Sequence, residues 1–407
     1  MPKTCIIIGA SHAAAQLAPS LRQEGWDGDI MIIGDEPHIP YHRPPLSKAF
    51  LAGEKDVDGL LIRPQAIYEK NAIEFKLGVR AEAINRGDKT VTLDTGEVLS
   101  YDKLALCMGS RVRKIPLAGS DLAGVHYLRD ITDVEAIKKS ITSSKHAVIV
   151  GGGYIGLETA AVLTRLGLSV TVLEMAPRIL ERVTAPEVSG FYHRIHTEEG
   201  VDIRTGVAVT ALDGAGQVCS VRCADGTSFK ADLVVIGAGI VPNVELAEAA
   251  GLEVVNGIVV DECCRTLDAD IVAAGDCTSH PNLLYQKPMR LESVPNATEQ
   301  GKTAAATLCG KAKPYHALPW FWSDQYDLKL QIAGLSQGYD QVIVRGDIET
   351  GRSFAAFYLK QSKLIAADCV NRPQEFMVSK RMIAAGGLVD STKLADESLP
   401  PKELMAI

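Results

Sequence analysis

One pattern occurs twice in this 407-residue chain and limits its fold more than any other feature. In each copy a strand-like apolar run leads into a turn rich in Gly and Ala, a helix-like apolar segment and a second strand-like run. The first copy comprises a strand, a helix and a strand at Cys5–Ile8, Ala13–Leu21 and Ile30–Ile33. The second comprises the same elements at Ala147–Val150, Leu157–Leu166 and Ser169–Leu173. Because such a unit places its two strands in parallel, the repeat predicts an α/β fold with two parallel sheets.

The turn of the second copy, Gly151–Gly156, follows the spacing G-x-G-x-x-G between a strand and a helix. In this motif the first Gly makes a tight turn, the second lets the backbone approach a pyrophosphate, and the third lets helix and strand pack closely. Glu174 ends the following strand, where an acid accepts hydrogen bonds from an adenosine ribose and repels a 2′-phosphate. The sequence therefore predicts an NADH site in a Rossmann-like domain. Two nearby basic residues keep NADPH open as an alternative, Arg178 and Arg182.

The turn of the first copy, Gly9–Ala14, departs from that spacing. Ser11 takes the place of the second Gly, and Ala14 takes the place of the third, where Ala is a common substitute. Asp35 closes the next strand in the position of the ribose acid. On this segment alone, a nucleotide fold that binds nothing stays an alternative. His12 invites a catalytic interpretation, but a helix cap or a neighbour of the pyrophosphate is the favoured one.

A later segment, Thr266–Asp276, consists of a turn, a buried strand and an acid that follows a Gly. It resembles the second FAD motif of flavoprotein reductases with two dinucleotide sites, which implies that Asp276 accepts a hydrogen bond from the ribityl chain. An N-cap Asp after a strand is the alternative. Together with Gly9 and Asp35, this residue predicts FAD as the nucleotide of the first domain. The turn Gly237–Asn243 is also typical of these enzymes, at the point where the chain returns to the FAD-binding domain.

Three further regions complete the predicted domain organisation. Leu77–Leu99 and Val201–Phe229 alternate like strands and contain turns, so we expect a small antiparallel sheet in each. After Pro319 the pattern changes to a separate antiparallel sheet followed by a helix. The elements expected there include Gln341–Val344, Phe354–Leu359 and Pro373–Ala384. The expected domains are an FAD-binding domain at residues 1–112 and 245–322, an NADH-binding domain at 113–244 and a C-terminal α+β domain at 323–407.

Charge and composition argue against several other classes of protein. The formal net charge of −8 argues against a nucleic-acid role, which needs a basic face. No apolar run approaches the roughly 20 residues that span a bilayer, and no signal peptide precedes the first strand, so we expect a cytoplasmic protein. The nine Cys residues are scattered, so we expect small buried side chains and neither disulfides nor a metal site.

The segment Tyr41–Lys48 contains no Cys. Disulfide reductases of this superfamily carry a Cys pair in the corresponding region, so here electrons are expected to leave the flavin directly. Its string R-P-P-L-S-K resembles the FAD-dependent NADH:ferredoxin reductases of bacterial oxygenase systems, whose architecture is like that of glutathione reductase. The likeness covers nearly the whole chain and includes Gly151–Glu158, Arg182–Pro186, Glu292–Ala297 and Pro319–Gln325. The family pattern is not followed at Ser11, Ala14 and Leu106–Gly109.

The resemblance implies roles for individual residues. Lys48 is expected near the N5 edge of the flavin, where a fixed positive charge stabilises the reduced form, and is expected to pair with Glu158 beside the nicotinamide. A surface Lys and an ordinary acid at a helix N-terminus are the alternatives. Trp320 and Trp322 are expected between the flavin and solvent, with packing at a domain interface as the alternative. The expected FAD contacts are Gly9, Ser11, His12, Ala13, Ala14, Asp35, Arg43, Lys48, Ala81, Arg129, Asp276 and Val294. The expected NAD contacts are Gly151, Gly153, Tyr154, Ile155, Gly156, Glu158, Glu174, Arg182 and Gly239.

The predicted function is electron transfer from NADH through FAD, one electron at a time, to a two-iron ferredoxin. The ferredoxin is expected to serve a haem monooxygenase or a ring-hydroxylating dioxygenase. Docking of an acidic ferredoxin needs a local basic patch, for which the candidates are Arg63, Arg290, Lys302, Lys311 and Lys313. An NADH oxidase or a rubredoxin reductase is the nearest alternative. A redox-sensing signalling flavoprotein of the apoptosis-inducing-factor type is the alternative from another class, and monomer versus homodimer stays open.

Overall fold

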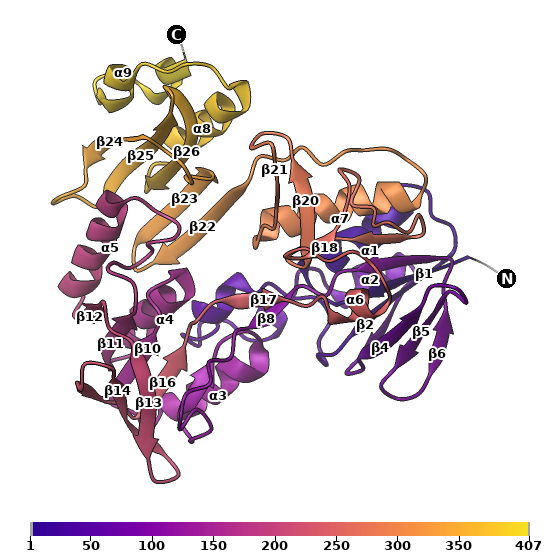
Figure 1. Ribbon diagram of the computed structural model, residues 1–407, viewed down its shortest axis with the longest axis horizontal. Helices are drawn as coiled ribbons and strands as arrows, with labels where there is room; N and C mark the ends of the chain where they lie inside the picture. The colour runs from indigo at the N-terminus through magenta and orange to yellow at the C-terminus, as the bar shows by residue number, and fades with distance from the viewer. Residues whose placement is uncertain (1–2, 406–407) are drawn as a thin grey trace. The chain divides into compact units, whose positions relative to one another are not determined.

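The computed structural model describes residues 3–405, which form two compact units. The first unit consists of the described residues up to His42 together with Asp58–Arg111 and Ile240–Pro319. The second consists of Arg43–Val57, Val112–Gly239 and the described residues from Trp320 onward. Each unit contains one of the two predicted parallel sheets, which confirms the α/β class (Figure 1).

A five-stranded parallel sheet in the order β19-β7-β1-β2-β3 lies at the centre of the first unit. Its strands are β1 (Thr4–Ile8), β2 (Asp29–Gly34), β3 (Ile73–Leu77), β7 (Lys103–Leu106) and β19 (Ile271–Ala273). Ile6, Ile7 and Ile32 are buried, as is typical of parallel strands that are covered on both faces. The helices α1 (His12–Gln23) and α7 (Val294–Leu308) pack against each other.

Smaller elements complete the first unit. One antiparallel sheet consists of β4 (Ala81–Asn85), β5 (Thr90–Leu93) and β6 (Val98–Ser100). A second small sheet consists of β18 (Ile258–Val259), β20 (Thr278–Asn282) and β21 (Lys287–Met289). The short helices are α2 (Gln65–Lys70) and α6 (Glu245–Ala249). The strand β8 (Ser110–Val112) pairs with β17 (Ile240–Pro242).

The second unit repeats the parallel design in the order β12-β11-β10-β16-β9. Its strands are β9 (Val125–Tyr127), β10 (His146–Val150), β11 (Ser169–Glu174), β12 (Asp202–Thr205) and β16 (Leu233–Ile236). Its helices are α3 (Ile131–Ile141), α4 (Tyr154–Arg165) and α5 (Pro186–Glu198). Asp130 and Asp133 form a capping box that fixes the start of α3. A small antiparallel sheet consists of β13 (Val209–Gly214), β14 (Val218–Cys223) and β15 (Ser228–Lys230).

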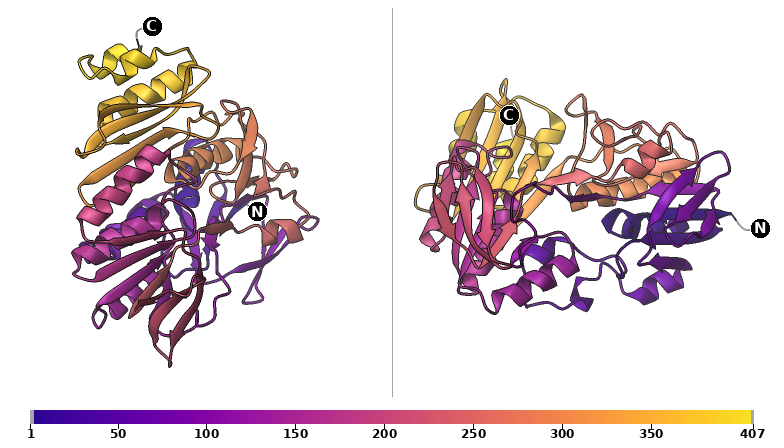
Figure 2. Two further views of the ribbon diagram at one scale, coloured as in Figure 1. Left: turned by 60° about the vertical axis from the view of Figure 1, so that its left-hand side comes forward. Right: turned by 60° about the horizontal axis from the view of Figure 1, so that its bottom comes forward.

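A five-stranded antiparallel sheet, in the order β22-β23-β26-β25-β24, also belongs to the second unit. Its strands are β22 (Trp320–Gln325), β23 (Leu328–Gly334), β24 (Gln341–Asp347), β25 (Ser353–Lys360) and β26 (Lys363–Val370). The helix α8 (Pro373–Ala385) lies against one face of this sheet, and the short α9 (Ser391–Ala395) follows it (Figure 2). The helix α5 packs near the sheet as well, since the ring centroids of Phe191 and Phe354 are 4.7 Å apart.

Element boundaries differ from the sequence predictions in two respects. The helices α1 and α4 begin inside the glycine motifs, at His12 and Tyr154, because the third small residue of each motif already belongs to the first helical turns. The segments predicted as small sheets also begin too early. Leu77 belongs to β3 and Asp202–Thr205 to β12, both in parallel sheets, which alternation alone does not distinguish from an inserted sheet. The division into three domains stays a prediction.

Candidate dinucleotide and redox sites

The turn after β1 is closed at Gly9. Its φ is +107°, and a Cβ there would lie 2.2 Å from the carbonyl oxygen of Cys107, so only Gly fits. Ser11 is the N-cap of α1, His12 is the first helical residue, and the first turn of the helix contains no acid. The helix therefore presents backbone N–H groups and the positive end of its dipole at the end of β1, as a pyrophosphate site requires.

Three segments of the first unit meet beside this turn. A Cβ at Gly275 would lie 3.4 Å from the Cβ of Ala13 and 3.7 Å from that of Ala297, so the loop after β19 touches α1 and α7. Asp276 follows in this loop, is half-buried and accepts a hydrogen bond of 2.8 Å from the Ser110 hydroxyl. The segments that meet here carry the predicted FAD contacts Ala13, Ala14, Asp276 and Val294.

Other predicted FAD contacts of the first unit lie at the carboxyl ends of its strands or beside them. Asp35 directly follows β2, and its carboxylate, which is 63% exposed, lies 3.6 Å from the guanidinium of Arg80. Such an exposed acid is accessible to a ribose. Ala81 begins β4 and is buried. The ring of His12 lies 5.5 Å from that of His42, centroid to centroid.

The second glycine turn has two closed positions and one open position. A Cβ at Gly151, whose φ is +113°, would lie 2.5 Å from the carbonyl oxygen of Gly237. A Cβ at Gly156 would lie 2.1 Å from the carbonyl oxygen of Gly151, which is too close for any side chain. At Gly153, the N-cap of α4, a Cβ would meet nothing within 4 Å. The backbone at Gly153 is therefore open to a ligand at a helix N-terminus that has no acid in its first turn.

Glu174 is fixed beside this turn at the end of β11. Its Oε2 accepts a hydrogen bond of 2.6 Å from the backbone N–H of Gly152, and its Oε1 accepts one of 2.7 Å from that of Ala176. The carboxylate therefore stands next to the open Gly153, in the position expected of a ribose acid.

The two basic residues that kept NADPH open differ in their surroundings. Arg178 donates to the Ser189 hydroxyl at 2.5 Å and to the carbonyl oxygen of Glu181 at 2.9 Å, so its guanidinium is committed to the start of α5. Arg182 is exposed, and its Nη2 would lie 4.0 Å from a Cβ at Gly239. The structure thus brings Arg182 and Gly239 together and occupies Arg178 elsewhere.

Glu158 is 2% exposed on α4, and three side chains of the second unit donate to its carboxylate. The ammonium of Lys48 and the hydroxyl of Ser47 each lie 2.6 Å from Oε2. The hydroxyl of Ser323, on β22, donates to Oε1 at 2.6 Å. Lys48 also donates to the carbonyl oxygen of Pro44 at 3.2 Å. The expected pairing of Lys48 with Glu158 is present, and the buried charge is both paired and hydrogen-bonded.

Two Arg residues predicted as FAD contacts, Arg43 and Arg129, belong to the second unit, as do Lys48 and Glu158. Arg43 donates from Nη1 to the carbonyl oxygen of Arg129 at 2.9 Å. The backbone N–H of Arg129 donates to the carboxylate of Asp133, at 2.8 Å, at the start of α3. The structure therefore brings Arg43 and Arg129 together.

The aromatic residues of β22 alternate between its two faces. Trp320 packs against Trp322, at 5.5 Å between ring centroids, and against Phe376 of α8, at 5.8 Å. On the opposite face, the ring of Phe321 lies 5.1 Å from that of Tyr154, the first residue of α4. Burial raises the pKa of the Tyr154 phenol well above its ordinary value, so its hydroxyl stays protonated. Both Trp side chains are partly exposed.

The residues present fit a dinucleotide in each unit. Both turns are closed by glycines that no other residue can replace, and both are followed by helix N-termini without an acid. Each adjoining strand ends at an acid that can hold a ribose, Asp35 or Glu174. A dinucleotide therefore fits each unit, and the sequence motifs predict FAD in the first and NADH in the second.

The cysteines follow the sequence prediction with two departures. Seven of the nine free Cys residues are buried, and burial raises the pKa of Cys107 and of Cys264, so these thiols stay protonated. Cys219 is exposed and Cys309 is half-buried, so the prediction of uniformly buried cysteines is wrong for them.

Each basic residue proposed for docking has a partner within the first unit. Arg63 donates to the carbonyl oxygen of Ala15 at 2.5 Å and to the Gln16 side chain at 3.0 Å, which makes it a structural residue. The other candidates pair with acids. These pairs are Arg290 with Glu292, Lys302 with Glu299, and Lys311 and Lys313 with Glu24.

Three residues around Glu158 were not predicted from the sequence. Ser47 and Ser323 donate to its carboxylate, and Gln325 donates to Ser323 at 3.2 Å. The sequence of β22 contains a signal for two of them, because Ser323 and Gln325 are two residues apart and therefore lie on the same face of the strand as Phe321.

The chain is similar to known oxidoreductases over almost its whole length. Residues 3–301 match the family described as pyridine nucleotide-disulphide oxidoreductase, and residues 320–405 match the family described as reductase C-terminal. The chain is 45% identical to putidaredoxin reductase of Pseudomonas putida, over 98% of this chain and 96% of that one. It is 42% identical to a ferredoxin–NAD(P)⁺ reductase of a Sphingomonas species, over 98% and 97% of the two chains. A crystal structure of a covalent putidaredoxin reductase–putidaredoxin complex superposes with a TM-score of 0.96 at 45% identity, over 99% of this chain and 98% of that one.

Proposed function

Because the chain belongs to the pyridine nucleotide-disulphide oxidoreductase family, we propose that it passes electrons from NADH through FAD to a two-iron ferredoxin. It is an FAD-dependent NADH:ferredoxin oxidoreductase of the kind that serves bacterial oxygenase systems. Its relatives include ferredoxin reductases over nearly their full length, and one relative is known in complex with putidaredoxin.

The observation that carries this proposal is the ion pair between Lys48 and the buried Glu158. The two charged groups are 2.6 Å apart, and Lys48 ends the segment Tyr41–Lys48, which contains no Cys. The protein therefore has a fixed charge where disulfide reductases have a redox-active pair. FAD, when bound, accepts hydride and returns single electrons, which suits a one-electron acceptor. We assign Lys48 to the flavin edge, where its ammonium stabilises developing negative charge.

The other site residues bind and orient the two nucleotides. The N-termini of α1 and α4 hold the pyrophosphates, and Asp35 and Glu174 hold the riboses. Glu158 orients Lys48 and faces the nicotinamide. Trp320 and Trp322 shield the flavin from water.

A matched set of variants tests the role of the pair. Lys48→Met retains the length of the side chain and removes its charge, so flavin reduction by NADH is expected to slow by about tenfold or more. The double variant Lys48→Met/Glu158→Gln removes both charges and restores charge balance. If the pair only stabilised the fold, the double variant would regain the wild-type rate, and the assignment would be wrong. Stopped-flow absorbance of the flavin measures the rate of flavin reduction in the wild type, the single variant and the double variant.

The ferredoxin surface is the finer part of the proposal. Lys302 is 50% exposed and, among residues 3–405, pairs only along its own helix, with Glu299, so it is the candidate best suited to contact an acidic partner. Arg290 and Arg63 are more enclosed and make contacts within the first unit.

A cytoplasmic location, where NADH is available, completes the proposal and is tested by cell fractionation. Among residues 3–405, no helix combines the length and hydropathy needed to cross a bilayer.

A further inference from the structure

The contact from Ser323 to Glu158 is the inner end of a longer run of hydrogen bonds. Gln325 Nε2 donates to Ser323 Oγ at 3.2 Å, and Gln325 Oε1 lies 2.7 Å from His196 Nε2. His196 Nδ1 lies 2.9 Å from the hydroxyl of Tyr326. Ser323, Gln325 and His196 are each at most 1% exposed, so the run crosses a dry interior between β22 and α5. We name these four residues, Ser323, Gln325, His196 and Tyr326, the donor chain.

The hydrogen bonds of the donor chain have one consistent direction. Ser323 has a single hydroxyl proton and faces the carboxylate of Glu158, which can only accept. With the amide of Gln325 donating to Ser323, its oxygen faces His196 and requires a proton on Nε2. In the opposite amide orientation, the one proton of Ser323 would face two acceptors. Each group therefore donates to the next one inward, and hydrogen bonds aligned in this way strengthen one another.

The protonation states of the outer residues support this direction. Burial lowers the pKa of His196 to about 4, so the ring is neutral at physiological pH and carries one N–H. With that proton on Nε2, Nδ1 accepts from Tyr326. Burial also raises the pKa of Tyr326, so its hydroxyl remains a donor. The other ionisable group that influences His196 is His193 on the same helix, which disfavours a second positive charge.

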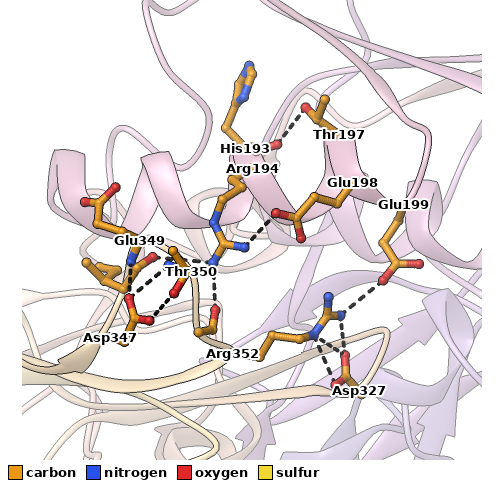
Figure 3. Close-up of polar contacts among 12 residues, drawn as sticks. His193, Arg194, Thr197, Glu198, Glu199, Asp327, Asp347, Glu349, Thr350 and Arg352 are labelled. Carbon is orange, nitrogen blue, oxygen red and sulfur yellow. Dashed lines mark hydrogen bonds and ion pairs between the residues drawn. The ribbon is translucent and has the colours of Figure 1, made fainter.

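The outer end of the donor chain is fixed at the protein surface. Tyr326 occupies the two-residue turn between β22 and β23 with a φ of +56°, a left-handed conformation that costs energy for a residue with a side chain. Arg352 donates to the carboxylate of Asp327, the other turn residue, and to that of Glu199 at 3.1 Å (Figure 3). Glu199 follows α5, so this clasp ties the turn of Tyr326 to the helix of His196.

We propose that the donor chain is a positioning device for the Lys48–Glu158 pair, through which α5 and the C-terminal sheet hold the Glu158 carboxylate in a single orientation. Without the donor chain, Glu158 Oε1 would lose its donor, or the Ser323 hydroxyl proton would be shared between Oε1 and another acceptor. The carboxylate could then rotate away from Lys48, whose ammonium is held by Oε2. The catalytic consequence of this inference rests on the proposed function, whereas the geometry of the donor chain does not.

The tautomer of His196 tests the direction of the hydrogen bonds in the donor chain, and measuring it needs neither NADH nor ferredoxin. ¹⁵N NMR of histidine-labelled holoprotein, assigned with a His196→Gln variant, is expected to show a neutral ring protonated on Nε2 throughout pH 6–8. A ring protonated on Nδ1 would overturn the inference, because the chain would then run in the opposite direction at His196. This measurement stands even if no ferredoxin accepts electrons from the protein.

Kinetics of flavin reduction test the consequence. His196→Phe keeps an aromatic ring and removes the donor, whereas His196→Gln places an amide N–H near the position of Nε2. Ser323→Ala breaks the chain at its inner end. With NADH, Ser323→Ala and His196→Phe are expected to reduce the flavin about tenfold more slowly, with the Kd for NAD⁺ changed by less than about twofold. His196→Gln is expected to recover most of the rate.

Thr197→Ala is the matched control, because its hydroxyl lies on the same helix and donates to the carbonyl oxygen of His193, within α5 itself (Figure 3). This control is expected to keep the wild-type rate. Equal losses in Thr197→Ala and His196→Phe, or no recovery in His196→Gln, would assign His196 a purely structural role and overturn the inference. If the chain variants slow flavin reduction while the wild type fails to reduce ferredoxin, the positioning role holds and the proposed function fails.

Discussion

Two glycines of the second turn belong to the same sequence motif, but one is tightly enclosed and the other is open. A Cβ at Gly156 would collide with the backbone at 2.1 Å, whereas a Cβ at Gly153 would meet no protein atom within 4 Å. Gly156→Ala is therefore expected to destabilise the protein by about 2 kcal/mol, as overpacking does in a tight interior. Gly153→Ala is expected to leave the melting temperature within a few degrees of wild type and to weaken NADH binding by about tenfold or more, because the methyl group occupies the pyrophosphate position. Calorimetry and NADH titration separate the two effects, and normal NADH affinity in Gly153→Ala would remove this turn from the nucleotide site.

We expect Glu174 to determine the preference between the two nicotinamide cofactors. Its carboxylate stands beside the open turn, whereas Arg178 is committed to α5 and is not positioned to bind a 2′-phosphate. Glu174→Ala is expected to raise the ratio of kcat/KM for NADPH to that for NADH by about tenfold, since a repulsion and a ribose contact are lost together. Steady-state rates with both cofactors measure this ratio. An unchanged ratio would mean that another group, such as Arg182, determines the preference.

At the scale of elements, β25 and β26 carry a buried pair whose protonation couples to pH. Tyr358 donates to Asp368, and burial raises the pKa of Asp368 to about 7 from its ordinary value of 3.8. The folded state thus retains a proton that the unfolded chain loses, so this contribution to stability is present below about pH 4 and is lost as the pH rises toward 7. An Asn side chain does not ionise, so the Asp368→Asn variant does not lose stability in this way as the pH rises.

The variant Asp368→Asn is therefore expected to gain stability relative to wild type as the pH rises from 5 to 7, by at most about 1.4 kcal/mol per pH unit. Urea unfolding at a series of pH values measures the difference. Glu349→Gln, in the exposed loop between β24 and β25, is the control and is expected to track wild type. A constant difference between Asp368→Asn and wild type across this range would show that Asp368 is already ionised in the folded protein.

The sequence predicted the repeated elements well because their signals are local. The apolar runs of β1 and β10, and the glycines that follow them, each determine their own turn and strand. The start of α4 was placed too late, because the pattern does not show that Gly156 is already helical. The donors around Glu158 were not predicted, since Ser47 and Ser323 are separated from it by 111 and 165 residues and meet it only in the fold.

At the scale of the whole molecule, the net charge of −8 means that an acidic ferredoxin would need a local basic contact in order to dock. Lys302→Glu is expected to raise the KM for ferredoxin several-fold at low ionic strength and to flatten its salt dependence, because exposed charges are screened by salt. Flavin reduction by NADH is expected to be unchanged. Lys230→Glu, exposed in the second unit, is the control for the change in net charge. Identical behaviour of the two variants would place docking elsewhere.

The central claim is that electrons from NADH leave this protein to an iron–sulfur acceptor. Anaerobic stopped-flow mixing of the FAD-loaded protein with NADH, followed by a second mixing with oxidised two-iron ferredoxin, tests it most directly. The expected result is rapid bleaching of the flavin and then reduction of two ferredoxins per NADH, much faster than the reduced protein reacts with oxygen in a parallel experiment. Flavin that is reduced by NADH but reacts with oxygen while leaving ferredoxin oxidised would contradict the claim and identify an NADH oxidase.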